Sequence, residues 1–298
     1  MFLGSFFFKH RARTALKGNW QTPLLVVFLA SLFLTVANVW QSTAFRDIES
    51  VAGSLSAAMS SLPEGTTMES ARFQEVRDLY GHLFAAIMAV PDSTYIGLII
   101  ANLAALILSP ILSVGSYHYF IERIDGRDIG LKEGLLGRVR SWRRILWLYV
   151  LIGVRVFLWT LLLIIPGIIA AIRYSMAPYY LADDPDLTAK EALEKSKEAM
   201  QGMKLSYLML QLSFVGWNLL ITMMQMVLID ISSVLSLVAA QFASLAVSVY
   251  LTASVAVFYR AVSRPDGVHA LIEGLRRSMN QMGVEIPEDD EKDGGEDE

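Results

Sequence analysis

The chain has 298 residues, of which 54% are hydrophobic and only 18% are charged, with a formal net charge of −4 and a mean hydropathy of +0.45. Ordinary soluble domains carry about 25% charged residues. The composition is therefore not typical of a soluble domain and indicates an integral membrane protein. The absence of cysteine excludes disulfides, thiolate metal sites and cysteine nucleophiles. Long apolar runs without alternation predict an all-α helical bundle.

The first 20 residues predict an amphipathic helix on the cytoplasmic surface of the membrane. Apolar side chains in this segment (Phe2, Leu3, Phe6, Phe7 and Phe8) are expected to face lipid. Its four basic residues (Lys9, Arg11, Arg13 and Lys17) are expected to meet anionic head groups. The helix is followed by a membrane domain at 21–264 and a cytoplasmic tail at 265–298, which is acidic and is predicted to be disordered from about residue 285.

Five apolar runs are long enough to cross a bilayer, at 21–40, 94–121, 145–182, 205–229 and 234–259. Basic residues in short loops mark the cytoplasmic side. Residues 1–20, 123–144 and 183–204 hold four, seven and four Lys or Arg, whereas 42–92 holds three with seven acids. This charge pattern requires the run 145–182 to cross twice, so that 183–204 stays inside.

The run 145–182 is predicted to be a helical hairpin. As one helix its 38 residues would be about 57 Å long, nearly twice the hydrocarbon core. Pro166 and Gly167 are the expected hinge, because Pro removes a backbone donor and Gly tolerates turn geometry. The arms are expected at about 145–164 and 168–182, the second being short enough to be tilted or re-entrant. The bundle then has six spans with both termini cytoplasmic.

Two segments outside the bilayer show helical periodicity. The outer loop 42–92 has two apolar faces separated by the breaking motif LPEG, which predicts two helices that cap the bundle or lie on the outer leaflet. The inner segment 187–202 has Thr188 and Glu191 at the spacing of a capping box, and Gly202 as its C-terminal stop.

The search for chemistry predicts no enzyme, no cofactor, no metal site and no nucleic-acid partner, because no catalytic or phosphate-binding motif occurs. Arg155 and Arg173 are the exceptions, since both lie inside an apolar run. The hairpin would bring the two arginines to a similar depth in the membrane. Asp230 is their expected acidic partner. They are either an anion-binding pocket for an anionic lipid or substrate, or snorkelling side chains.

The stretch APYYLADDPDLTAKEALEKSKEAMQGMKLSYLMLQLSFVGW resembles an uncharacterised bacterial integral membrane family, the domain of unknown function nine-seven-five. The PG…P…S…G arrangement is more distantly similar to the membrane region of some glycerophosphodiester phosphodiesterases. The resemblance implies a multi-pass protein of the bacterial plasma membrane and supplies no activity. The principal matching residues are Pro178, Asp183, Pro185, Ser196, Gly202, Ser213, Phe214, Gly216 and Trp217.

The leading functional hypothesis is a non-enzymatic, lipid-interacting scaffold or an accessory to a membrane complex. The expected partners are membrane lipids, with anionic ones favoured, and a membrane protein or a second copy of the chain that packs on small residues in 234–259. A transporter or lipid-translocating protein that uses the hairpin is the main alternative. A sensor that uses the outer loop 42–92 is the third.

A reporter fused after Asp186 tests the predicted topology. The basic segment that follows should hold this point on the cytoplasmic side, so a cytoplasmic reporter should be active and an exported one inactive. Activity of the exported reporter would contradict the two-crossing hairpin.

Overall fold

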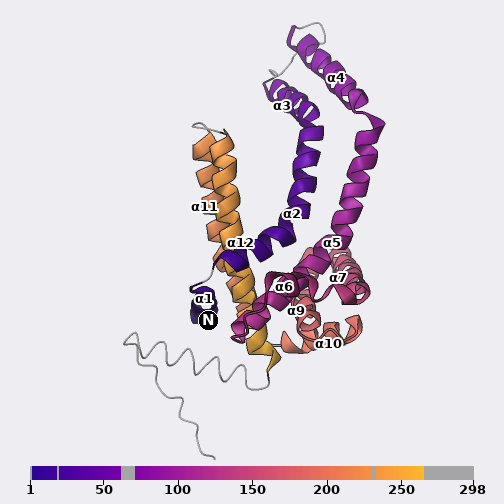
Figure 1. Cartoon of the computed structure of the whole chain (residues 1–298). Helices are drawn as coiled ribbons and strands as arrows, with labels where there is room; N and C mark the ends of the chain where they lie inside the picture. The colour runs from indigo at the N-terminus through magenta and orange to yellow at the C-terminus, as the bar shows by residue number, and fades with distance from the viewer. Residues whose placement is uncertain (1, 19, 62–70, 230–232, 265–298) are drawn as a thin grey trace, which may run out of the picture. The chain divides into compact units, whose positions relative to one another are not determined.

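The computed structural model describes residues 2–18, 20–61, 71–229 and 233–264, and these residues form helices and turns without a strand (Figure 1). The predicted all-α class is therefore confirmed. The chain divides into two compact units, residues 1–28 with 111–298 and residues 29–110. Helices α2 (Gln21–Ala44) and α5 (Asp92–Ile124) belong partly to each unit, and α5 changes unit directly after Pro110.

Four helical stretches of the described residues are long and apolar enough to cross a membrane, namely Asp92–Ile124, Leu131–Leu162, Lys204–Val227 and Ala239–Ser263. Each coincides with a predicted span. The predicted span at 21–40 lies within α2, of which Gln21–Leu32 forms a shorter apolar helix.

Residues 29–110 contain the predicted outer loop. It forms two helices, α3 (Arg46–Ser60) and α4 (Ala71–Ala89), which pack against each other as the periodicity predicts. Leu55 and Val76 are their buried apolar side chains, and the Tyr80 hydroxyl lies 3.6 Å from the Met59 sulfur. The predicted apolar face of α4 is only partly used, because Phe84 further along it is 62% exposed.

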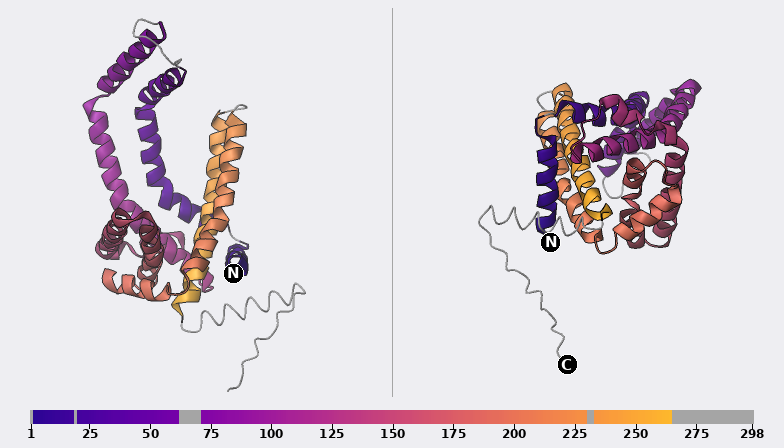
Figure 2. Two further views of the ribbon diagram at one scale, coloured as in Figure 1. Left: turned by 180° about the vertical axis from the view of Figure 1, so that it is seen from behind. Right: turned by 60° about the horizontal axis from the view of Figure 1, so that its bottom comes forward.

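The other unit is built around the C-terminal half of α12 (Ser233–Ser263), whose residues 253–259 are all buried. Helices α11 (Lys204–Ile229) and α1 (Phe2–Leu16) both pack against it (Figure 2). The Phe8 ring lies edge-on to Phe258, with 5.2 Å between their centroids. The expectation that Phe7 and Phe8 face lipid is wrong, because α1 docks on the bundle and both rings are buried there.

The predicted hairpin forms, but its break lies elsewhere. Helix α7 (Trp142–Leu162) ends at Leu163, which has extended backbone angles, and α8 (Ile164–Tyr174) begins directly after it. The predicted hinge at Pro166 and Gly167 is therefore wrong. Pro166 lies in the first turn of α8, where most backbone N–H groups lack an intrahelical partner and Pro is tolerated.

Gly167 serves the packing of the hairpin. A β-carbon at this position would overlap the Thr160 hydroxyl and the Thr160 backbone on the facing helix. Its missing side chain thus allows α7 and α8 to approach closely.

The second predicted arm, 168–182, is not one helix. Helix α8 has eleven residues, which is about 16 Å of rise and roughly half of the hydrocarbon core. After a turn at Ser175 and Met176, the shorter helix α9 (Ala177–Asp183) follows. Two further elements precede the hairpin, α6 (Leu131–Leu136) and the 3-10 helix η1 (Val139–Ser141).

Helix α10 (Ala189–Ala199) begins with the predicted capping box. The Glu191 carboxylate accepts a hydrogen bond from the Thr188 backbone at 2.8 Å, and the Thr188 hydroxyl accepts one from the Glu191 backbone at 3.3 Å. The first of these bonds is the main reason why the pKa of Glu191 is lowered. The buried face of this segment is mainly apolar and includes Ala192, Leu193 and Met200.

Replacing Gly167 with Ala tests the close approach of α7 and α8. The added methyl should force the two helices apart at Thr160 and destabilise the protein by about 1–3 kcal/mol. The measurement is the thermal unfolding midpoint of the purified protein in detergent. Gly153→Ala on α7 is the matched control, because nothing lies within 4 Å of its added β-carbon. Equal midpoints for the two variants would contradict the packing role.

Candidate functional site

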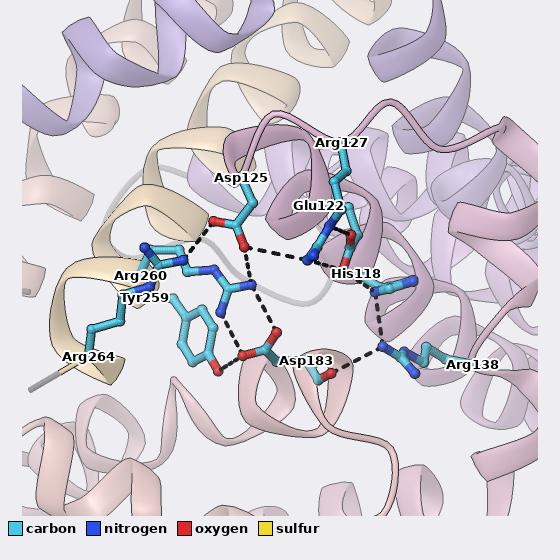
Figure 3. Close-up of polar contacts among 9 residues, drawn as sticks. All are labelled: His118, Glu122, Asp125, Arg127, Arg138, Asp183, Tyr259, Arg260 and Arg264. Carbon is cyan, nitrogen blue, oxygen red and sulfur yellow. Dashed lines mark hydrogen bonds and ion pairs between the residues drawn. The ribbon is translucent and has the colours of Figure 1, made fainter.

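The principal polar site of the larger unit is centred on Asp183, the last residue of α9. The helix ends there because Asp184 takes an extended conformation, and its Oδ1 accepts a hydrogen bond from the Asp186 backbone at 3.0 Å. This Asx-type turn leads the chain toward the capping box of α10. The turn is the structural reason for the DDPD sequence, and it leaves the Asp183 carboxylate pointing toward α12 (Figure 3).

Two consecutive residues of α12 hold the Asp183 carboxylate. Arg260 donates from Nη1 to Oδ2 at 2.6 Å and from Nη2 to Oδ1 at 2.9 Å, which is a bidentate pair. The Tyr259 hydroxyl donates to Oδ2 at 2.8 Å. The Arg260 side chain is 13% exposed and that of Asp183 29%, so the pair is screened less than a surface salt bridge.

The C-terminal end of α5 joins the same cluster through Asp125. Its Oδ2 accepts from Arg260 Nη2 at 2.6 Å and its Oδ1 from Arg264 Nη2 at 3.0 Å. One turn earlier on α5, Glu122 pairs with Arg127 through both carboxylate oxygens. Arg260 therefore links two carboxylates that belong to different helices.

Arg138, which follows α6, closes the cluster on its other side. Its Nη2 lies 3.1 Å from the Nδ1 atom of His118 on α5 and donates to the Asp183 carbonyl at 3.2 Å. Figure 3 shows this arginine on the side of Asp183 away from Arg260. The segment before α7 is thus attached to both α5 and α9.

The cluster holds the ends of several helices together. Three carboxylates (Glu122, Asp125 and Asp183) face four guanidinium groups (Arg127, Arg138, Arg260 and Arg264). Each carboxylate accepts hydrogen bonds from at least one arginine, and these bonds occupy lone pairs of its oxygens. Among the described residues, no group of three or more His, Asp or Glu side chains is placed to hold a metal ion.

The structure gives separate contacts to Arg155 and Arg173, and the anion-binding pocket that is one interpretation of these arginines stays a prediction. The hairpin brings Arg155 to the second helix, but its guanidinium carbon lies 5.6 Å from the centroid of the Tyr174 ring, a cation–π contact. The Arg173 carbonyl accepts a hydrogen bond from the Ser196 hydroxyl at 2.8 Å. Within the described part of the chain neither arginine makes an ion pair, and Asp230, their predicted partner, lies outside it.

The other residues singled out by the family resemblance have mainly structural places. Ser196 is fully buried and joins α10 to α8 through the Arg173 carbonyl. Gly202 has a φ of 74°, the left-handed conformation expected after a helix. Pro178 is buried in the first turn of α9, and the Pro185 carbonyl accepts a hydrogen bond from Arg144.

A second group of these residues lies on α11. The Ser213 carbonyl accepts a hydrogen bond from Lys9 Nζ at 3.3 Å, and the same ammonium lies 4.5 Å from the centroid of the Phe214 ring. This pair therefore anchors α1. Gly216 has open space around it, and Trp217 is 52% exposed.

The sequence reasoning missed the partners of Asp183. Neither Arg260 nor Asp125 belongs to a recognisable motif, although each lies at or just beyond the end of an apolar run that faces the predicted cytoplasmic side. Their common place at helix ends on one side of the membrane is the feature of the sequence that indicates an ion pair, because opposite charges at neighbouring helix ends are able to pair.

Replacing Asp183 with Asn tests the cluster. The change removes the carboxylate charge and part of the bidentate pair, and should cost about 2 kcal/mol of stability, the range for hydrogen bonds to charged groups. Asp186→Asn is the matched control, because that side chain is 97% exposed and lies 3.8 Å from Arg144. The thermal midpoint in detergent should fall for Asp183→Asn alone. Equal midpoints would show that the cluster adds no stability.

Comparison with known proteins agrees with the position of this site. Residues 160–266 match the family described as protein of unknown function DUF975, a stretch that runs from the end of α7 to just beyond α12 and includes Asp183 and Arg260. No curated protein and no solved structure matches the chain. The distant similarity to the membrane region of glycerophosphodiester phosphodiesterases therefore stays a prediction. Over residues 160–266 the chain is therefore similar to the DUF975 family of proteins of unknown function.

Proposed function

We propose that the protein is a non-enzymatic membrane scaffold that inserts the tip of the α7–α8 hairpin into the hydrocarbon core. The observation that carries this proposal is the tip itself. Five consecutive large apolar side chains are exposed there, namely Leu161 by 74%, Leu162 by 70%, Leu163 by 64%, Ile164 by 70% and Ile165 by 71%. A run of this kind is unfavourable in water and is typical of a surface that contacts lipid or protein.

The two ends of α7 have opposite character. Arg143 and Arg144 lie at its start, whereas its last turns carry no charge. Its 21 residues rise about 31 Å, close to the hydrocarbon thickness. The basic end suits the predicted cytoplasmic interface, so α7 would cross most of the hydrocarbon core and its apolar tip would lie toward the far side of that core. The half-length helix α8 then returns only part of the way.

The base of this hairpin is held by neighbouring helices. Ser196 ties α10 to the end of α8, while Arg138 and Asp183 tie the elements on either side of the hairpin together. A hairpin with a firm base and an apolar tip is suited to organising lipids or a neighbouring spanning helix. Transport through the hairpin, the alternative, is less favoured because the cation of Arg155 already contacts Tyr174.

Spin labels at the hairpin tip test the proposal directly. The chain has no cysteine, so Leu162→Cys or Ile165→Cys carries the only nitroxide label. In bilayers the label should collide readily with oxygen and rarely with a water-soluble nickel complex, as it does in hydrocarbon. Asp186→Cys is the control in the exposed turn and should collide readily with nickel.

The other patterns of accessibility would contradict lipid insertion at the tip. Ready collision of tip labels with nickel would place them in water. Protection from both reagents would mean that protein covers the tip. A detergent-solubilised sample measured in parallel should give an unchanged unfolding midpoint, which shows that the labelled protein is folded.

A further inference from the structure

A hollow of about 480 Å³ lies on helix α1 and is separate from the polar cluster around Asp183. It is lined by His10, Arg13, Thr14, Lys17 and Trp20. The first four residues share one face of the helix because they are three or four positions apart. The chain turns at Gly18, after which Trp20 completes the wall. The hollow thus combines two basic side chains, Arg13 and Lys17, with a histidine and an indole.

Lys9 contacts the bundle, whereas Arg13 and Lys17 line the hollow. Lys9 points into the bundle, where it donates to the Ser213 carbonyl and lies over the Phe214 ring, and burial lowers the pKa of its ammonium group. It anchors the helix and is unavailable to a ligand. Arg13 and Lys17 are exposed and line the hollow instead.

Within the described residues, Arg13 and Lys17 have no acidic partner. No acidic residue precedes Asp47 in the sequence. The positive potential is therefore available to an anion from outside the chain.

We infer that this hollow binds the phosphate of an anionic lipid headgroup, an inference that rests on the proposed lipid-interacting function and gives it a headgroup chemistry. The planar guanidinium of Arg13 suits two phosphate oxygens, and the ammonium of Lys17 adds a point charge. Trp20 favours a lipid over a free phosphate, because indole rings prefer the level of the head groups. Phe6 is 55% exposed on the same helix and supplies an apolar contact for the glycerol and acyl region.

The experiment measures binding of short-chain phosphatidylglycerol to the full-length protein in detergent. Dioctanoyl phosphatidylglycerol should bind measurably more tightly than dioctanoyl phosphatidylcholine. Arg13→Gln and Lys17→Gln should each weaken phosphatidylglycerol binding by about fivefold, the size expected for one basic residue near an anionic headgroup. Arg11→Gln is the matched control, because it removes one charge from an exposed position of the same helix that does not line the hollow.

Three outcomes would overturn the inference. Equal losses for Arg11→Gln, Arg13→Gln and Lys17→Gln would show only a diffuse charge effect. Equal affinity for the two lipids would remove the requirement for an anion. Inorganic phosphate that binds as tightly as phosphatidylglycerol would assign the hollow to a free phosphate. Because the lipid is added in detergent, this result does not depend on whether the hairpin tip enters a bilayer.

Discussion

The bidentate pair between Asp183 and Arg260 is the interaction on which the larger unit depends. Charged groups at the ends of apolar helices are costly to bury unless they are paired and fully hydrogen-bonded. Here one guanidinium contacts carboxylates from α9 and α5, and Tyr259 beside it adds a hydroxyl donor. The pair therefore holds three helices at one point, next to the buried half of α12.

The aromatic packing around α12 depends on the same arrangement. Tyr179 stacks on Tyr117 with 4.2 Å between ring centroids, and Tyr259 lies within 6 Å of both Tyr179 and Tyr180. On another side of α12, Phe258 contacts Phe8 of α1 and Tyr207 of α11. One buried helix thus organises the polar and the apolar contacts of its unit.

Two features of the unit are directed outward instead of inward. The α7–α8 hairpin keeps its base within the bundle while its tip is exposed and apolar. Helix α1 anchors one lysine in the bundle and leaves two basic residues around an open hollow. The first suits acyl chains and the second suits a headgroup, so both are consistent with a protein whose ligand is the membrane.

Local patterns in the sequence determined the helical class, the two helices of the segment 42–92 and the capping box at Thr188 and Glu191. Such features depend on residues close in the chain, so periodicity and spacing are enough to predict them. Only the tertiary structure decided that the hairpin breaks at Leu163, that Gly167 serves a helix contact and that Phe8 is buried by α12. The partners of Asp183 belong to this second group. Arg260 lies 77 positions away and Asp125 is distant on the other side, so their pairing depends on how the helices pack and not on any local pattern.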